Sequence, residues 1–229
     1  ISDDSVVTSS TYDVMNHQTS KKDGEGNVVT YVYENLKALK EVRINDGTGN
    51  DNVTTFENDV LEPDGTTSSK TTDANGNVSK EYFDTSGNKI KTSDLGDGSI
   101  TPITTFYVYD NNDNVIRETY ADGNYKEFQY DERSRLKQEG CFDKNGSQSL
   151  ETKYTYTETD QILVIEDFKI SGGQKKRYHY TNYTYDENDQ LTGVAEYNGE
   201  DIPSEAQLAG GRIAYSYDLD GRLTEIIYP

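Results

Sequence analysis

Aromatic residues stand at alternate positions directly before an acidic residue, and this short pattern recurs along the chain. Side chains at alternate positions of an extended strand point to one face, so the spacing predicts half-buried β-strands. A motif that returns every few dozen residues indicates one supersecondary unit stacked many times. The clear copies are Tyr107-Val108-Tyr109-Asp110, Phe128-Gln129-Tyr130-Asp131, Tyr183-Thr184-Tyr185-Asp186 and Tyr215-Ser216-Tyr217-Asp218, and weaker copies are Tyr31–Glu34 and Tyr154–Thr157.

The acidic residue after each aromatic pair begins a predicted turn. Aspartate at the first position of a type I turn caps it with its own side chain, and glycine, asparagine or aspartate three residues later tolerates the left-handed conformation that closes a three-residue hairpin loop. The turns begin at Asp23, Asp73, Asp84, Asp110, Asp131, Asp143, Asp186 and Asp218, with degenerate copies at Glu34 and Thr157. The residues three positions later are Gly26, Gly76, Gly87, Asp113, Ser134, Gly146, Asp189 and Gly221.

An apolar residue follows five positions after the turn residue in most copies. If the aspartate pairs with the residue four positions later, the preceding tyrosine faces this apolar residue across the hairpin. Such aromatic–aliphatic pairs stabilise a sheet by roughly 0.2–1 kcal/mol each. The predicted pairs are Tyr109 with Val115, Tyr130 with Leu136, Tyr185 with Leu191 and Tyr217 with Leu223. The equivalent apolar residues of other copies are Val28, Leu39, Val78 and Ile162.

Between these turns the chain must reverse direction again. Asp122-Gly123, between Tyr120 and Tyr125, is typical of a two-residue hairpin loop, and Gly172-Gly173 and Asn198-Gly199 could serve the same purpose with longer loops. The predicted unit is therefore a strand, an Asp-type turn, a second strand and a Gly-type turn. We expect an all-β fold in which repeated antiparallel β-hairpins stack into an extended, curved or single-layer sheet.

Three segments do not follow this pattern directly. Residues 34–44 have helical propensity, but their register against Tyr31 and Tyr33 matches the other hairpins and favours strand over helix. Residues 203–209 could form a short helical turn capped by Ser204. Residues 1–20 carry no recognisable copy, so we interpret 1–20 as an N-terminal linker or first strand and 21–229 as the repeat domain.

The composition narrows the class of protein. A formal net charge of −20 repels phosphate backbones and anionic membranes, so we expect no nucleic-acid partner. Few aliphatic residues and a high charge make disorder an alternative, but 19 tyrosines supply apolar surface and the apolar positions alternate in register. No run of 18 apolar residues predicts a membrane span, and a signal peptide or lipid-anchor cysteine would lie upstream of Ile1.

No residues group into a recognisable catalytic or metal site. Cys141, His17 and His179 have no ligand spacing and no triad order, and the 42 carboxylates allow no reasoned choice of a glycosidase pair. Residues 46–51 and 110–114 cluster oxygen ligands suited to calcium, but neither has EF-hand spacing, so Asp-rich turns without an ion are favoured. We therefore expect no enzyme, no cofactor and no metal.

The segment from Tyr215 to Leu223 (YSYDLDGRL) resembles the YD repeats of bacterial Rhs proteins, wall-associated proteins and their animal relatives. Phe128 to Leu136 (FQYDERSRL) keeps the same frame with Phe for Tyr and Ser for Gly. The resemblance implies a secreted or surface-exposed bacterial protein. In large members of the family the repeats wind into a hollow shell around a toxin; about ten turns here are too few for a closed shell, so the resemblance favours an open sheet.

The function favoured by these observations is a non-enzymatic, secreted or cell-surface repeat protein that acts as a structural or macromolecular-interaction module. The alternative is a carbohydrate-binding accessory protein of a surface nutrient system, and a hydrolase is a more distant third. The partner is then a protein or a glycan of unknown identity, and the location is extracellular or the bacterial cell surface. The residues expected to define the repeat are Tyr107, Tyr109, Asp110, Tyr130, Asp131, Leu136, Tyr185, Asp186, Leu191, Tyr217, Asp218, Gly221 and Leu223.

Overall fold

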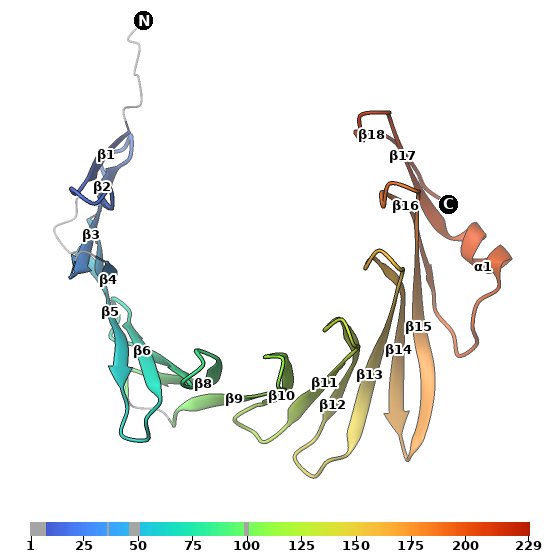
Figure 1. Ribbon diagram of the computed structural model, residues 1–229, viewed down its shortest axis with the longest axis horizontal. Helices are drawn as coiled ribbons and strands as arrows, with labels where there is room; N and C mark the ends of the chain where they lie inside the picture. Colours follow the sequence, from blue (N-terminus) through green and yellow to red (C-terminus); the bar gives the residue numbers. More distant parts are fainter. Residues whose placement is uncertain (1–7, 36, 46–50, 99–100) are drawn as a thin grey trace, which may run out of the picture. The chain divides into compact units, whose positions relative to one another are not determined.

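The computed structural model describes residues 8–35, 37–45, 51–98 and 101–229, which form eighteen β-strands and one short helix (Figure 1). The strands belong to an open, antiparallel sheet, so the predicted all-β fold of repeated hairpins is confirmed. The chain divides into two compact units, unit 1 (residues 1–106) and unit 2 (residues 107–229).

Unit 1 is a meander in which each strand pairs with the next along the chain, from β1 with β2 to β8 with β9. Its strands are β1 (Ser9–Tyr12), β2 (Gln18–Lys22), β3 (Val28–Glu34), β4 (Ala38–Asn45), β5 (Asp51–Leu61), β6 (Thr67–Thr72), β7 (Val78–Phe83) and β8 (Lys89–Gly96). The boundary between the units falls within β9 (Ile103–Tyr109).

Unit 2 continues the same meander order from β10 to β18 and adds one helix before β17. Its elements are β10 (Val115–Thr119), β11 (Tyr125–Tyr130), β12 (Leu136–Phe142), β13 (Gln148–Tyr156), β14 (Ile162–Ser171), β15 (Gln174–Tyr185), β16 (Leu191–Tyr197), α1 (Glu205–Gly210), β17 (Arg212–Tyr217) and β18 (Leu223–Ile227). Short loops explain the order, because a tight turn returns the chain to the neighbouring antiparallel position.

The predicted three-residue turn is present, and the Asp131 turn shows its geometry. The backbone N–H of Asp131 donates to the carbonyl of Arg135 at 2.9 Å, and the N–H of Ser134 donates back to the Asp131 carbonyl at 3.0 Å. Ser134 has φ of 58°, the left-handed conformation that closes the loop. The Asp131 carboxylate accepts the N–H groups of Arg133 and Arg135 at 2.9 and 3.0 Å, which satisfies donors that the turn leaves unpaired.

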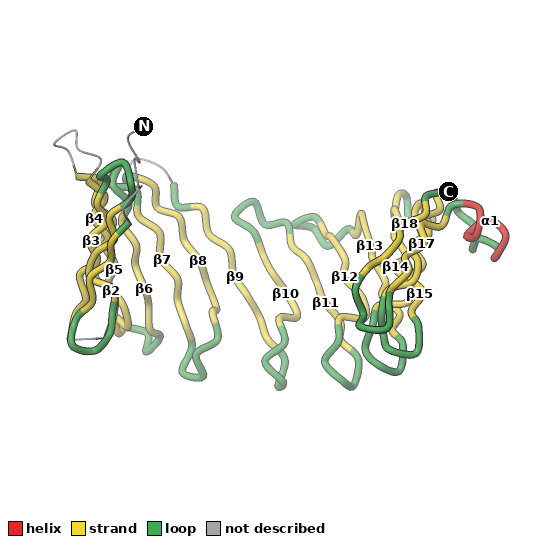
Figure 2. The backbone as a smooth tube through the Cα atoms, turned by 90° about the horizontal axis from the view of Figure 1, so that it is seen from above, coloured by secondary structure: helices red, strands yellow, loops and turns green. Residues whose placement is uncertain are grey.

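Successive loops of a meander lie at alternate ends of the strands, so the turns fall into two sets (Figure 2). We name one set the tyrosine end. In unit 1 it consists of the loops that begin at Asp13, Glu34, Glu62 and Asp84, and in unit 2 of those that begin at Asp110, Asp131, Thr157, Asp186 and Asp218. The loops that begin at Asp23, Asp73 and Asp143 have the same backbone but lie at the opposite end of the strands. The sequence pattern of the turns is therefore the same at both ends and does not distinguish the two sets.

Two of the return loops differ from the prediction. Asp122-Gly123 was expected to form a two-residue loop, but Tyr120 donates to the Asn124 carbonyl at 2.9 Å, and the turn is the three-residue type. The prediction was wrong because this turn is closed by backbone groups and needs positive φ only at its fourth residue, Gly123. Gly172-Gly173 instead forms the two-residue loop, with both residues at positive φ and Ser171 opposite Gln174.

The structure also resolves the three segments that lay outside the pattern. Residues 34–44 contribute to strands β3 and β4, so the preference for strand is confirmed. The predicted helical turn is α1, and Ser204 caps it in a reciprocal capping box with Gln207. Within residues 1–20, β1 leads into a turn that begins at Asp13 and continues into β2.

The sheet buries very few apolar side chains. Among the described residues, Ala195 and Leu208 are the only hydrophobic side chains classed as buried. Leu208 belongs to α1, which packs against β16. Elsewhere in unit 2 cationic side chains lie over aromatic rings, as Lys175 and Arg177 do over Phe168 at 4.3 and 5.4 Å. Side chains of the same sheet face therefore cover the aromatic rings, and stability depends on neighbour contacts rather than on a central core.

Candidate interaction surface

Tyrosine hydroxyl groups connect several hairpins to the one before them. The hydroxyl of Tyr130 donates to the carbonyl of Val115 at 2.9 Å, and that of Tyr156 donates to the carbonyl of Leu136 at 2.7 Å. The remaining bonds of this set join Tyr33 to Gln18 at 3.1 Å, Tyr185 to Ile162 at 2.7 Å and Tyr217 to Leu191 at 2.9 Å. We name these five hydrogen bonds the tyrosine ladder.

The ladder explains why the repeat needs a tyrosine before the turn and a particular residue after it. Leu136 lies opposite Tyr130 within its own hairpin, and its carbonyl accepts the hydroxyl of Tyr156 from the next hairpin. One residue therefore takes part in two contacts, a side-chain contact within the hairpin and a backbone contact between hairpins. Each ladder bond is worth about 0.5–1.5 kcal/mol, so the set makes a considerable contribution to a sheet with little core.

Burial keeps three of the ladder hydroxyls in the protonated form that donates. Desolvation raises the pKa of Tyr130, Tyr156 and Tyr185 above the usual value, because the phenolate is disfavoured away from water. Nearby Asp110 adds to the shift at Tyr130, and nearby Asp131 adds to it at Tyr156. The ladder bonds of these three tyrosines are therefore intact throughout the neutral pH range.

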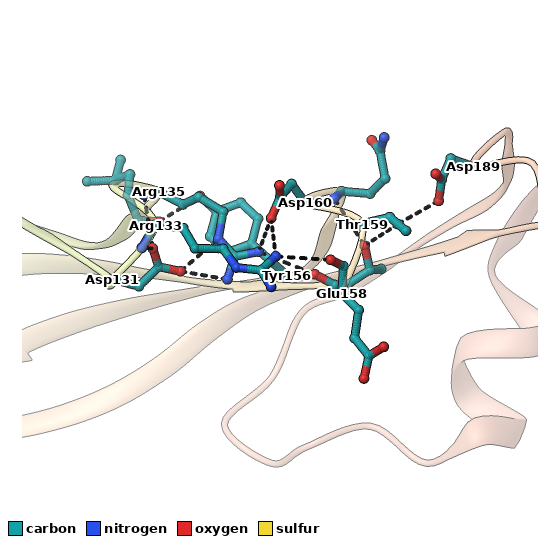
Figure 3. A network of polar contacts seen from close by, with 11 residues as sticks. Asp131, Arg133, Arg135, Tyr156, Glu158, Thr159, Asp160 and Asp189 are labelled. Carbon is teal, nitrogen blue, oxygen red and sulfur yellow. Dashed lines mark hydrogen bonds and ion pairs between the residues drawn. The ribbon is translucent and has the colours of Figure 1, made fainter.

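Side chains of neighbouring turns also contact one another along the tyrosine end of unit 2 (Figure 3). Arg135 binds Asp131 of its own turn at 2.6 Å and Asp160 of the next turn at 2.6 Å, and its guanidinium lies 4.5 Å from the ring centroid of Tyr156. Arg133 adds a second contact to Asp160 at 3.0 Å and donates to the Glu158 carbonyl at 3.1 Å. Two arginines of one turn thus hold the following turn.

Contacts between neighbouring turns continue on both sides of the two arginines, toward the Asp110 turn and toward the Asp186 turn. The Asn114 side chain donates to the Ser134 hydroxyl at 3.2 Å. On the other side, the Thr159 hydroxyl donates to Asp189 at 2.6 Å (Figure 3). The hydrogen bond from Arg135 is the largest cause of the lowered pKa of Asp131, so this carboxylate is ionised well into the acidic range. The turns from Asp110 to Asp186 consequently form one continuous polar surface.

One face of unit 2 carries a series of half-exposed aromatic and aliphatic side chains. Strand register places Tyr154 opposite Ile165, Tyr183 opposite Val194 and Tyr215 opposite Ile226. The Tyr154 hydroxyl also donates to Glu139 at 3.0 Å on the neighbouring strand. The other face carries α1, whose Gln207 donates to the Tyr197 hydroxyl at 3.2 Å.

The residues predicted to define the repeat occupy equivalent positions in unit 2. The register places Tyr130 opposite Leu136, Tyr185 opposite Leu191 and Tyr217 opposite Leu223, as predicted. The turns at Asp110, Asp131, Asp186 and Asp218 all have the backbone hydrogen bonds described above, and Gly221 has φ of 76°. Tyr107 and Tyr109 lie in β9, directly before the Asp110 turn.

Sequence reasoning missed both the ladder and one complete turn. Tyr12 and Asp13 form a turn of the same type, with Tyr12 opposite Gln18. Its Tyr-Asp dipeptide was a usable signal, but Asn16 replaces glycine and Gln18 replaces the apolar residue, so the frame was not recognised. The ladder involves a backbone carbonyl of another hairpin, and no side-chain pattern reveals such an acceptor.

The two histidines and the cysteine considered as candidate site residues lie among other side chains of the sheet. His17 contacts Asp13 at 3.1 Å and stacks on Tyr33 at 4.8 Å, while His179 contacts Asp167 at 3.2 Å. Cys141 is half-buried, between Lys126 and Leu150 on the adjacent strands. These three described residues lie on different hairpins and do not contact one another.

The possible calcium ligands divide into two cases. Residues 46–50 lie outside the described residues. In the second candidate loop, residues 110–114, both carboxylate oxygens of Asp110 accept hydrogen bonds. The donors are the backbone N–H groups of Asn112 and Asn114 and the Asn114 side chain, the last at 3.0 Å. In the described part of the chain no three His, Cys, Asp or Glu side chains gather as metal ligands would.

An open groove of about 760 Å³ lies at the tyrosine end between the turns of Asp186 and Asp218. Its lining includes Tyr215, Tyr217 and Gln190, which combine aromatic rings with amide and hydroxyl groups. Such a lining suits a polar ligand with an apolar face. Among the helical segments described, none has the length and apolar character of a membrane span.

Comparison with known proteins identifies the fold. No family model matches the sequence, and no curated protein sequence matches it. A crystal structure of TcdB2-TccC3 without its hypervariable C-terminal region has a similar fold, with a TM-score of 0.56 and 14% identity over 94% of this chain. The Tc holotoxin pore of Photorhabdus luminescens is similar over 96% of this chain, with a TM-score of 0.53 and 16% identity. This chain spans only 12% and 14% of those chains, and identities this low show a shared fold alone.

Proposed function

We propose that the protein is a non-enzymatic structural and interaction module of the YD-repeat type, secreted or displayed on a bacterial surface. The observation that carries this proposal is the tyrosine ladder, because it joins successive hairpins of unit 2 through side chains that the repeat motif itself supplies. The polar contacts at the tyrosine end likewise connect turns to one another. These residues serve to extend a sheet, whose half-exposed aromatic face is then available to a macromolecular partner.

The similar folds support the structural part of the proposal. Both are chains of Tc toxin assemblies, and this chain corresponds to a small part of each. A sheet built from neighbour contacts can be lengthened or shortened by whole repeats, which suits a scaffold. The net charge of −20 favours a partner whose surface is basic or neutral.

Deletion of one whole repeat tests the structural part. Removal of residues 131–156 takes out β12 and β13 and places Tyr130 directly before the Thr157 turn, so the alternation of ends and the tyrosine frame are kept. We expect this variant to retain its β circular dichroism and a cooperative thermal transition.

The matched control removes residues 131–143, which deletes one strand and reverses the order of the ends. We expect that variant to lose the transition or to aggregate. Equal behaviour of the two deletions, whether both fold or both fail, would contradict a sheet built from interchangeable hairpins.

A second candidate, a carbohydrate-binding protein, is favoured by the groove between the Asp186 and Asp218 turns. Its tyrosine rings could stack on a sugar while Gln190 and Asn188 bind hydroxyl groups. A glycan-array screen of the intact chain tests this candidate directly. Binding that Tyr215→Ala abolishes and Tyr154→Ala leaves unchanged would support it, because Tyr154 lies on another hairpin away from the groove lining.

A further inference from the structure

Arg212 differs from the other arginines of the chain, because no carboxylate lies within ion-pair distance of it among the described residues. The arginines that have such a partner are Arg43, Arg117, Arg133, Arg135, Arg177 and Arg222. The sequence carries 42 acidic residues, so carboxylates are not scarce. A guanidinium stays charged at every physiological pH, and Arg212 therefore presents a positive charge that the described side chains leave unpaired.

The neighbouring strands hold the Arg212 side chain in one direction. Arg212 begins β17, and its guanidinium donates to the side-chain oxygen of Asn182 on β15 at 3.2 Å. The side chain therefore crosses β16, where Ala195 lies opposite both residues. A Cβ at Gly193 of β16 would lie 2.8 Å from Cδ of Arg212. The missing side chain at Gly193 thus leaves room for the arginine stem.

Most of the hydrogen-bonding capacity of this guanidinium is unused. Its bond to Asn182 is the one found among the described residues, and its Nε is buried without a partner there. Arg177 also has a buried Nε without a partner, but its terminal N–H binds Glu166. The planar fork of an arginine matches a carboxylate. An external carboxylate would meet the terminal N–H groups of Arg212, since Nε is buried.

Arg212 lines an open pocket of about 520 Å³, within the range of about 300–1,000 Å³ that is usual for small-molecule sites. The lining includes Asn182 and Thr184 of β15 and Glu205 of α1. Tyr215 and Tyr217 line the groove between the Asp186 and Asp218 turns but not this pocket. The pocket is therefore a separate site from that groove.

The pocket includes a segment that departs from the hairpin repeat. Residues 198–211 connect β16 to β17 and contain α1, whereas the other connections described in unit 2 are short turns. The capping box of Ser204 and Gln207 fixes the start of α1, and the buried Leu208 holds it against β16. Insertions into a repeat often form its binding surface. Here the insertion fixes Glu205 in the lining.

The other groups of the pocket suit hydroxyl groups rather than further charges. The Glu205 carboxylate can accept hydrogen bonds from hydroxyls, and the Thr184 hydroxyl can donate or accept. Glu158 and Asp189, both labelled in Figure 3, also line the pocket. These carboxylates and the net charge of −20 repel a ligand with many negative charges. A ligand with one carboxylate and several hydroxyls satisfies both requirements.

We propose that this pocket binds a single hexuronate unit of a glycan. The sugar carboxylate pairs with the guanidinium of Arg212, and ring hydroxyls bind Glu205 and Thr184. An acidic peptide supplies the carboxylate but few hydroxyls, so it satisfies Arg212 alone. This inference goes beyond the proposed structural role and does not depend on it.

Calorimetric titration of the intact chain tests the ligand class. The probes are glucuronosyl-xylose and galacturonosyl-rhamnose, which have one carboxylate each, and their methyl esters, which keep the hydroxyls but lose the charge. We expect saturable binding of at least one acid at pH 7 and roughly 10- to 100-fold weaker binding of its ester. No saturable binding of either acid, or equal binding of acid and ester, would overturn the proposal.

Substitution of the arginine tests the residue. Arg212→Gln should abolish the preference for acid over ester, and Arg212→Lys should keep part of it, because a point charge does not reproduce the fork. The ratio of the two affinities within one variant does not depend on the fraction that is folded. The matched control, Arg117→Gln, removes an arginine paired with Glu127 and should keep the full preference. A preference that survives in Arg212→Gln would contradict the assignment.

Two further measurements separate the alternatives. Gly193→Ala keeps the charge but places a Cβ against the Arg212 stem, so it should lower the preference for the acid severalfold. An acetylated glutamate dipeptide that binds as tightly as the sugar acids would show a general carboxylate site and overturn the glycan assignment. If the 131–156 deletion folds as expected and neither sugar acid binds the intact chain, this inference is wrong and the structural role stands.

Discussion

Units 1 and 2 share the backbone of their turns but differ in what joins one hairpin to the next. At the tyrosine end of unit 1 the residues before the turns are Tyr12, Tyr33, Leu61 and Phe83, and Tyr33 supplies the ladder bond described for this unit. In unit 2 the corresponding Tyr130, Tyr156, Tyr185 and Tyr217 all donate to the preceding hairpin.

The difference shows that the residues that form a hairpin are not the ones that join it to the next hairpin. Leu61 and Phe83 precede turns with the same backbone hydrogen bonds, so the turn does not require the tyrosine. Both units carry ion pairs between neighbouring strands, and in unit 1 those of Lys70 with Glu57 at 2.7 Å and of Lys89 with Glu81 at 3.1 Å lie within single hairpins. Exposed ion pairs contribute about 0–1 kcal/mol and are screened by salt. We therefore expect unit 2 to be the more stable unit.

The largest effect should come from the turn shared by both units. Gly221→Val in unit 2 and Gly87→Val in unit 1 each force a β-branched residue to positive φ, at a cost of about 1–2 kcal/mol. The two costs should be similar, because the atom 2.8 Å from a Cβ at Gly221 is the terminal amide nitrogen of the flexible Gln190 side chain, which can move aside, and nothing lies within 4 Å at Gly87. Urea unfolding followed by hydrogen exchange in each unit measures both.

The control for the turn substitutions is Gly210→Val at the end of α1. A Cβ at Gly210 meets nothing within 4 Å, and this glycine is not among those with positive φ. We expect a smaller loss of stability than at Gly221. Equal urea midpoints for Gly221→Val and Gly210→Val would show that positive φ is not what this turn requires.

The ladder hydroxyl should have the next largest effect, and mainly in unit 2. Tyr185→Phe removes a 2.7 Å hydrogen bond and should lower the stability of unit 2 by about 0.5–1.5 kcal/mol. Phe83→Tyr adds a hydroxyl before the Asp84 turn of unit 1, but Thr67 lies directly opposite Phe83, one residue away from the ladder register, so we expect a smaller change there than for Tyr185→Phe.

Hydrogen exchange of the strands on either side of each substitution separates the local effects. Tyr183→Phe is the control, because the Tyr183 hydroxyl has no recorded hydrogen bond to a described residue. The ladder would lose its proposed importance if Tyr185→Phe and Tyr183→Phe had the same exchange rates as the unmodified protein.

Alkaline pH should weaken unit 2 through its buried hydroxyls. Folding raises the pKa of Tyr130, Tyr156 and Tyr185, so their stabilising contribution is complete below the unfolded value of about 10 and is lost as pH rises through the folded pKa. Thermal melts and unit-resolved exchange between about pH 8 and pH 11 measure this loss. The variant with all three tyrosines changed to phenylalanine should show a shallower decline, and an unchanged slope would contradict the assignment.

The smallest effect should come from the ion pairs between turns. Asp160→Asn removes contacts with Arg133 and Arg135, but Asp160 is 57% exposed and Arg135 keeps its contact with Asp131. We expect a loss of about 0.2–1 kcal/mol at low salt, measured by urea unfolding, and little loss at 1 M salt. A larger loss of stability that persists at high salt would show that these ion pairs couple the two turns strongly, which would contradict the expectation.

Much of the local structure followed from the sequence. Asp131, Ser134 and Leu136 identified a turn and its register because each acts through its own backbone conformation or its nearest cross-strand neighbour. Ser204 and Gln207 identified the helix cap for the same reason. The predictions failed where backbone groups alone close a turn, as at Tyr120, and where Asn16 and Gln18 depart from the repeat frame.

The sequence by itself determined the antiparallel hairpins, because turn chemistry and two-residue alternation act over a few positions along the chain. Only the tertiary structure decided that turns of one sequence type lie at two opposite ends, since this depends on the parity of strands between them. It also decided the tyrosine ladder, in which a hydroxyl reaches a carbonyl 15–26 residues earlier in the chain. Every residue has such a carbonyl, so its selection depends on the register of stacked hairpins and leaves no side-chain signature at the acceptor.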